Sequence, residues 1–192
     1  MVDIYMKRIM TDGIIYTDTT PISNKYGREN IGRNKYYKNK NISKLSLITD
    51  NNKAILNIQL FSGNKNDSRI AVEHLTNLEN EKNSAIMNNP GKVHTLIADA
   101  GYDSSKVRDK LTKYNIKCII DLNKRNTKDE KKLAKRKMTR NEKKLYRERI
   151  KIEQANALIK KCRRIDVRYD QLEKTYMGFV YMGGMYSLIK HI

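Results

Sequence analysis

The chain has 192 residues, 39% of them hydrophobic, which suffices for one domain with a real core, alone or with a small appendage. Lys and Arg (40) outnumber Asp and Glu (21), so the formal net charge is +19. The electrostatic field of so much positive charge attracts polyanions, which favours nucleic acid as the partner. A basic structural or ribosome-associated protein is the alternative, and A/T-rich codons would also enrich the Lys, Asn, Ile and Tyr seen here.

Several classes of protein are excluded by what the sequence lacks. No apolar run reaches the roughly 20 residues that span a bilayer, and residues 1–12 lack the apolar core of a signal peptide. Cys118 and Cys162 lie far apart without a CxxC pattern, and the three histidines have no ligand spacing. We therefore expect a reduced, intracellular protein with no membrane partner, no disulfide framework and no zinc site.

The N-terminal half of the chain is predicted to be rich in strands. Residues 13–18 form an apolar strand that ends in Asp-Thr-Thr-Pro, and a polar stretch dense in Lys, Arg, Asn and Tyr covers residues 23–41. Residues 42–49 alternate between polar and apolar, residues 50–52 have turn composition, and residues 54–61 form the next strand. The last three segments together predict a β-hairpin.

Helices and strands alternate in the next part. A helix capped by Asp67 or Ser68 is predicted to run to about residue 80. Residues 93–98 form a short buried strand, and residues 116–121 form another. Between these two strands a helix capped by Ser104 or Ser105 is predicted to end near residue 114.

The C-terminal part is predicted to be helical. Residues 123–140 are crowded with Lys and Arg and predict a basic loop, residues 141–164 predict one long helix, and residues 176–189 predict a last helix. The order predicts an α/β protein whose central mixed five-stranded sheet is flanked by helices. Several α/β folds share this order, and the RNase H-like nuclease fold is one of them.

Three carboxylates hold the positions that such a fold would use for chemistry. Asp18 ends the first predicted strand, Asp99 follows the fourth, and Glu153 lies in the long helix. In an RNase H-like sheet the first and fourth strands are neighbours, and that helix packs near their ends. Carboxylate oxygens suit Mg²⁺ or Mn²⁺, and two such ions about 4 Å apart can activate water and stabilise a leaving oxygen.

Each of these acids has a structural explanation as well. An Asp at the end of a strand is commonly a turn residue, and a Glu in a Lys-rich helix is commonly half of an exposed ion pair. Other acids compete for the same role: Asp12, Asp50, Asp67, Asp103 and Asp121. The three chosen acids are therefore supported only by their order and by their neighbours.

The long helix supplies such neighbours. Tyr146, Arg149, Glu153 and Lys160 fall within an arc of about 60° at about 100° per residue. A neighbouring apolar arc is expected to face the core, and it consists of Leu145, Ile152, Ala155, Ile159 and Cys162. Cations beside an acid suit contact with phosphates, and a tyrosine suits base stacking or a phosphate hydrogen bond. A charged, solvated helix face is the alternative.

The same four residues carry a resemblance to a known family. One branch of the DDE transposases of bacterial-type insertion sequences has a signature in which Tyr, Arg, Glu and Lys are separated by two, three and six residues. The chain fits this spacing without adjustment. Further segments resemble blocks of that family in the same order: residues 17–22, 44–50, 63–68, 97–103 and the closing Arg168-Tyr169 with its apolar tail. The resemblance covers residues 13–189.

The resemblance implies a fold and an activity. The fold is RNase H-like, and the activity is metal-dependent hydrolysis of a phosphodiester at an element's end, followed by attack of the freed 3′-hydroxyl on target DNA. Asp18, Asp99 and Glu153 would hold two Mg²⁺ (or Mn²⁺) ions, while the remaining residues of the signature would grip the DNA near the cut. The implied partners are double-stranded DNA, both element ends and target, and a second subunit in a DNA-bound homodimer.

Two departures limit the resemblance. Only 17 residues precede Asp18, whereas family members commonly carry a substantial N-terminal region that recognises the element's end. The connection 123–140 is short and basic and is not an insertion domain. We therefore interpret residues 1–192 as a single catalytic domain, with residues 1–12 as an N-terminal remnant. An endonuclease without strand transfer and an inactive or truncated DNA-binding protein derived from a transposase remain as alternatives.

Overall fold

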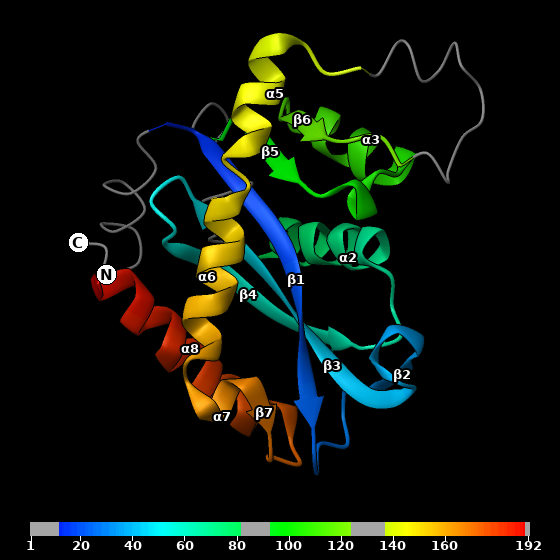
Figure 1. Cartoon of the computed structure of the whole chain (residues 1–192), viewed down its shortest axis with the longest axis vertical. Coiled ribbons are helices and arrows are strands. Elements are labelled where there is room, and N and C mark those ends of the chain that lie inside the picture. Colours follow the sequence, from blue (N-terminus) through cyan, green and yellow to red (C-terminus); the bar gives the residue numbers. More distant parts are fainter. Residues whose placement is uncertain (1–11, 82–92, 124–136, 191–192) are drawn as a thin grey trace.

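The computed structural model describes residues 12–81, 93–123 and 137–190 (Figure 1). Most of the predicted N-terminal remnant and most of the predicted basic connection, residues 1–11 and 124–136, lie outside the described residues. In the described part, no helix is long and apolar enough to cross a membrane.

A mixed sheet forms the centre of the molecule. Its main strands are β1 (Ile14–Asn24), β3 (Lys40–Asp50), β4 (Ile55–Ser62), β5 (Thr95–Ala98) and β6 (Lys117–Ile120). They lie in the order β4-β3-β1-β5-β6, with β3 antiparallel to its neighbours and β5 and β6 parallel to β1. This is the arrangement of an RNase H-like fold, and it confirms the predicted mixed five-stranded sheet.

Two short strands extend this sheet beyond the prediction. The first, β2 (Gly32–Asn34), pairs with the start of β3, and the second, β7 (Val167–Arg168), pairs with the end of β1. Both come from segments that had no strand pattern of their own. They are held in place by the longer strands that they join.

Helices cover both faces of the sheet (Figure 1). Helices α2 (Asp67–Asn80) and α3 (Ser105–Lys113) pack on one face with Ile15, Leu96 and Ala98. The other face carries α5 (Arg140–Arg147), α6 (Ile150–Lys160), the short α7 (Arg163–Asp166) and α8 (Glu173–Lys190). Tyr16 and Ile97 point to that second face, because successive side chains of a strand alternate between faces.

The first strand is longer than predicted. It was expected to end at Asp18, but β1 continues past Pro21 to Asn24 and remains paired with β3 as far as Ser23. Strand β5 ends opposite Thr17, and β7 joins β1 only at Ser23, so this edge of β1 is open from Asp18 to Ile22. A proline is tolerated in a strand with an open edge. Asp18 is therefore an internal residue of β1 and lies just where this edge opens.

The long helix predicted for residues 141–164 is wrong as a single element. Helix α5 ends at Arg147, α6 starts at Ile150, and a short α7 (Arg163–Asp166) follows. At the break the backbone hydrogen bonds are of the 3-10 type, in which a residue donates to the third residue before it. Glu148 N donates to Leu145 O, and Arg149 N donates to Tyr146 O. Such turns are tighter than α-helical turns, so they rotate α6 relative to α5.

The predicted core face of this helical region is confirmed. Ile152, Ala155 and Ile159 are buried on α6, and Leu145 and Cys162 pack against the same core. The remaining helices and strands begin and end within three residues of their predicted positions.

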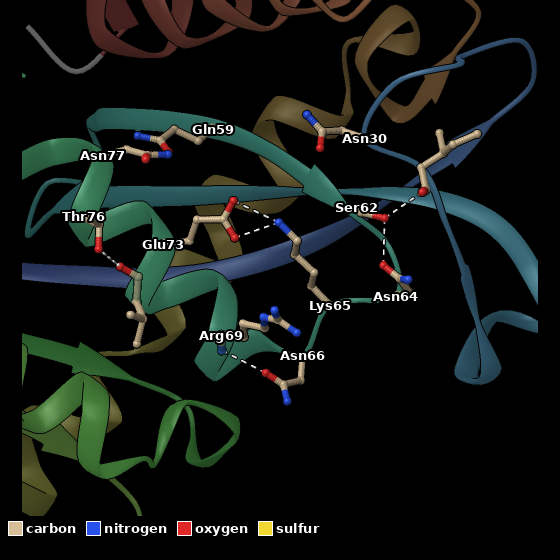
Figure 2. Close-up of polar contacts among 12 residues, drawn as sticks. Asn30, Gln59, Ser62, Asn64, Lys65, Asn66, Arg69, Glu73, Thr76 and Asn77 are labelled. Carbon is tan, nitrogen blue, oxygen red and sulfur yellow. Dashed lines mark hydrogen bonds and ion pairs between the residues drawn. The ribbon is translucent and has the colours of Figure 1, made fainter. Parts of the chain in front are cut away.

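The cap of α2 differs from the prediction in a way that matters for the site. Asn66, rather than Asp67 or Ser68, caps the helix, and its side chain accepts a hydrogen bond from Arg69 N at 2.9 Å (Figure 2). The carboxylate of Asp67 is therefore available for other partners. Ser104 caps α3, as predicted.

Arg168 joins the end of β1 to the segment before α8. Its guanidinium is fully buried and donates hydrogen bonds to the carbonyl oxygens of Glu29, Asp170 and Gln171 at 2.7, 3.1 and 3.2 Å. It also lies over the ring of Tyr176, 5.4 Å from the centroid. A planar guanidinium with several fixed donors can reach all three carbonyl groups, whereas a lysine ammonium group could not.

We expect Arg168→Met to lower the free energy of unfolding by about 3 kcal/mol or more, because it leaves buried carbonyl groups without donors. Urea unfolding measures this loss. The exposed Arg163→Met variant is the control, and its change should stay within about 0.5 kcal/mol. Equal stability of the two variants would contradict the role given to Arg168.

Asp50 closes the β3–β4 turn and provides a pH-dependent contribution to stability. It is 2% exposed and its Oδ1 accepts hydrogen bonds from Asn52 N and Ala54 N. Burial raises the pKa of its carboxyl from 3.8 to about 6. Folding therefore favours the protonated form, and this contribution is lost as the pH rises through about 6.

Asp50→Asn keeps an Oδ1 acceptor and has no charge to bury. Relative to the native protein, the stability of this variant should rise between pH 4 and pH 7 by an amount on the order of 1 kcal/mol. Thermal unfolding at several pH values measures the difference, with the exposed Asp109→Asn as the control for the loss of one charge. A difference that falls with rising pH would show that the buried carboxylate stabilises the turn instead.

Candidate active site

Two of the predicted acids meet where β1 and β5 run in parallel. Thr17 pairs with Ala98 in the sheet, so the next residues along the chain, Asp18 and Asp99, lie at the same level. Asp18 is an internal residue of β1 and is partly buried, whereas Asp99 directly follows β5 and is exposed. The structure thus brings these two predicted acids together at the level of the backbone.

The surroundings of Asp18 oppose its negative charge. The pKa of its carboxyl is raised from 3.8 to about 6, chiefly by burial and also by the charges of Asp67 and Asp99, against the lowering effects of the Thr19 amide and Arg149. Asn156 on α6 donates a hydrogen bond to Asp18 Oδ2 at 2.9 Å. A partly buried carboxylate beside other acids is stabilised by any cation that binds between them.

The junction of α5 and α6 brings polar groups to the same place. The hydroxyl of Tyr146 contacts Asp99 Oδ1 at 3.4 Å, and the guanidinium of Arg149 lies 5.9 Å from the centre of the Tyr146 ring. Arg149 also pairs with Glu153, with 2.7 Å between Nη2 and Oε1. Three of the four signature residues are thus linked to one another and to Asp99.

Arg149 lies in the field of all three predicted acids. Burial alone would lower the pKa of its guanidinium, but Glu153, Asp99 and Asp18 together raise it above its usual value. The positive charge of this side chain therefore partly balances the acids.

The acids fit a divalent cation only in part. Asp18 and Asp99 supply hard oxygen ligands from adjacent strands, and the raised pKa of Asp18 indicates a need for positive charge. Glu153 has a half-exposed side chain that is paired with Arg149. No group of three or more His, Cys, Asp or Glu residues suited to a metal ion occurs among the residues described. Glu153 could join the aspartates only after its ion pair with Arg149 opens.

Lys160 is the fourth signature residue and lies apart from this cluster. It is the last residue of α6, and its Nζ is 3.3 Å from Asp166 Oδ1. The break before α6 separates Tyr146 from the helix that carries Glu153 and Lys160. The single continuous face expected for all four residues is therefore interrupted.

Asp67 is a residue of the site that the sequence offered only as a competing acid. Its Oδ1 accepts a hydrogen bond from Thr19 Oγ1 at 2.6 Å and pairs with Lys44 Nζ at 2.8 Å. The charge of Asp67 raises the pKa of Asp18. The pKa of Tyr102 is raised mainly by burial and also by the charges of Asp18 and Asp67. Lys44 and Asp67 belong to the segments 44–50 and 63–68 of the resemblance, and this was the signal that could have identified them.

Comparison with known proteins identifies the family. The sequence model of the transposase DDE domain family matches residues 10–188. No curated protein matches the chain. Among solved structures, the catalytic domain of Mos1 mariner transposase is 12% identical with a TM-score of 0.40 over 99% of this chain and 89% of its own. The pre-cleavage Mos1 transpososome is 11% identical with a TM-score of 0.39 over 95% of this chain. The chain spans 59% of the length of that Mos1 protein. With nearly its whole length matched, the chain belongs to the transposase DDE domain family.

Proposed function

We propose that this chain is the catalytic core of a DDE transposase, which hydrolyses DNA phosphodiesters and joins the freed 3′-hydroxyl to a target strand. The observation that carries the proposal is the register of β1 and β5, which sets Asp18 beside Asp99 at the open edge of the sheet. The polar junction of α5 and α6 against these acids adds support.

In this proposal Asp18, Asp99 and Glu153 hold two Mg²⁺ (or Mn²⁺) ions. The bound ions would supply an activated water and would stabilise the leaving oxygen. Asn156 holds the carboxylate of Asp18 in place through its 2.9 Å hydrogen bond, and the hydroxyl of Tyr146 borders Asp99. These two contacts limit the positions that the ligands can take.

The cations of the site would exchange partners when DNA binds. Arg149 would leave Glu153 for a phosphate, which frees the carboxylate to serve as a ligand. Lys160 would leave Asp166 in the same way and bind the backbone further along α6. Tyr146 would contact the DNA beside the cut. The cost of opening each ion pair is small because all of these side chains are partly exposed.

The remaining parts of the proposal concern organisation. Residues 1–192 would form one catalytic domain that acts on double-stranded DNA, both element ends and target, inside the cell. A homodimer on DNA would hold two ends together. An endonuclease without strand transfer and an inactive DNA-binding protein are the competing functions, and the next experiment separates them.

Supercoiled plasmid incubated with the protein and Mg²⁺ should be nicked, and EDTA should stop the reaction. Asp99→Asn and Glu153→Gln should each lower the nicking rate by at least about 100-fold, because each removes a proposed metal ligand. Glu148→Gln is the matched control, since Glu148 lies in the same helical region but pairs with Lys151. Nicking that persists in both ligand variants would refute the proposed triad.

A second substrate tests strand transfer. A labelled duplex with a free 3′-hydroxyl should become joined to the plasmid if the chain is a transposase. Nicking without joining would identify an endonuclease. Metal-independent DNA binding with no nicking at all would identify a binding protein.

Arg149 offers a test that does not depend on catalysis. Because its guanidinium balances the same acids that would bind metal, Arg149→Gln should raise the affinity for Mn²⁺ by about 5-fold to 10-fold, as measured by calorimetry. The same variant should nick DNA more slowly, since the proposed phosphate contact is lost. Arg147→Gln, an exposed neighbour, should change neither quantity. Unchanged or weaker Mn²⁺ binding in Arg149→Gln would contradict this competition.

A further inference from the structure

The turn between β2 and β3 carries exposed aromatic and basic side chains that the proposed active site does not use. We call residues 32–40 the tyrosine hairpin. It consists of β2, a 3-10 turn (Lys35–Tyr37) and the connection to β3, and it lies at the lower right of Figure 1. Tyr36 at its tip is 88% exposed. The exposed cations of the hairpin are Arg33, Lys35, Lys38 and Lys40. No Asp or Glu occurs between residues 30 and 49.

The tip of the hairpin is held rigidly. Asn34 is buried, its Oδ1 accepts a hydrogen bond from Tyr36 N at 2.9 Å, and its Nδ2 donates to Gly63 O at 2.7 Å. Lys38 and Asn39 adopt left-handed backbone angles, with φ of 51° and 57°. Non-glycine residues hold such angles only where their surroundings enforce them.

The base of the hairpin is fixed to the segment that leads into α2. Ser62 Oγ donates a hydrogen bond to Ile31 O at 2.7 Å and lies 2.8 Å from Asn64 Oδ1 (Figure 2). Arg33 Nε donates to Asn39 O at 3.1 Å and closes the hairpin on itself. The hairpin is therefore organised before any ligand arrives, which lowers the entropic cost of binding.

The hairpin lies near Asp67, one of the acids of the candidate site. Lys44, four residues after its end, pairs with Asp67, and Asp67 acts on Asp18. The charge of Asp67 also reaches Tyr37, where it adds to the effect of burial and raises the pKa of that phenol. Asp67 belongs to α2, which packs on the opposite face of the sheet from α6. DNA that touches both α6 and the hairpin would pass across the edge where Asp18 and Asp99 lie.

The chemistry of the tip indicates what it binds. An exposed tyrosine ring adds nothing to the core, whereas an aromatic ring among lysines matches a nucleotide, whose base stacks and whose phosphate pairs with the cations. The base faces of an intact duplex are covered by their neighbours, so a protruding ring fits an unpaired nucleotide better. A single strand or a frayed end adjacent to the cut has this character.

We propose that the tyrosine hairpin is a second DNA-binding surface, on which Tyr36 stacks an unpaired nucleotide while Lys35 and Lys38 bind the backbone. This inference depends on the proposed function only in taking DNA as the substrate. It assigns the hairpin to the DNA strand that leaves the active site on the side away from α6.

Binding without metal tests the surface separately from catalysis. Fluorescence anisotropy in EDTA compares a labelled duplex of about 20 base pairs with the same duplex carrying a single-stranded tail of about five nucleotides. Tyr36→Ala should weaken binding of the tailed DNA by about 5-fold to 10-fold and should change binding of the blunt duplex less than about 2-fold. Tyr36→Phe should bind the tailed DNA as the native protein does. Tyr186→Ala, which removes another exposed tyrosine on α8, should have no effect.

A charge variant tests the backbone contacts. Lys35→Gln combined with Lys38→Gln should weaken the binding of both DNAs. It should also reduce the number of counterions released on binding, measured from the salt dependence of the affinity, by about two. Unchanged binding of tailed DNA by Tyr36→Ala would overturn the stacking role. Equal or tighter binding of a tail made of RNA would overturn the assignment to DNA.

The two proposals fail separately in these experiments. Native protein that discriminates tailed from blunt DNA through Tyr36 but never nicks plasmid supports the surface and removes the catalytic proposal. Protein that nicks plasmid in a ligand-dependent manner while Tyr36→Ala binds normally supports catalysis and removes the surface.

Discussion

The proposed activity depends on the parallel pairing of β1 with β5, which places two aspartates side by side. Thr17 and Ala98 are the last paired residues, and each is followed in the chain by an aspartate. Because β5 stops there while β1 continues to Asn24, the two carboxylates border an open edge that helix α6 approaches from one face and Asp67 from the other. A shift of one residue in this register would turn one aspartate to the opposite face of the sheet.

Charge compensation links this register to the rest of the site. A chain with a net charge of +19 has cations for DNA in excess, yet around Asp18 the nearest charged groups include two other acids. Arg149 partly offsets them and also pairs with Glu153. In the proposed reaction this guanidinium would pair either with the acids that hold the metal ions or with a DNA phosphate. Metal and DNA binding are coupled if this side chain changes partner.

Local patterns were sufficient to predict the five main strands, the core face of α6 and the proximity of Asp18 to Asp99, because these depend on periodicity and on strand order. The break between α5 and α6 was not predictable in this way, since three-residue turns leave no mark on a helical pattern. Asp67 was not distinguished from other acids because its importance comes from Thr19 and Lys44, which are distant in the chain. The short strand β2 depends on its pairing with β3 and has no pattern of its own.

Shared binding of a divalent cation by Asp18 and Asp99 is the central claim, and Mn²⁺ binding followed by electron paramagnetic resonance tests it most directly. The native protein should bind Mn²⁺, and Asp18→Asn and Asp99→Asn should each abolish the same binding event, with folding confirmed by circular dichroism. Retention of full Mn²⁺ binding in both variants would show that the two aspartates do not form a metal site.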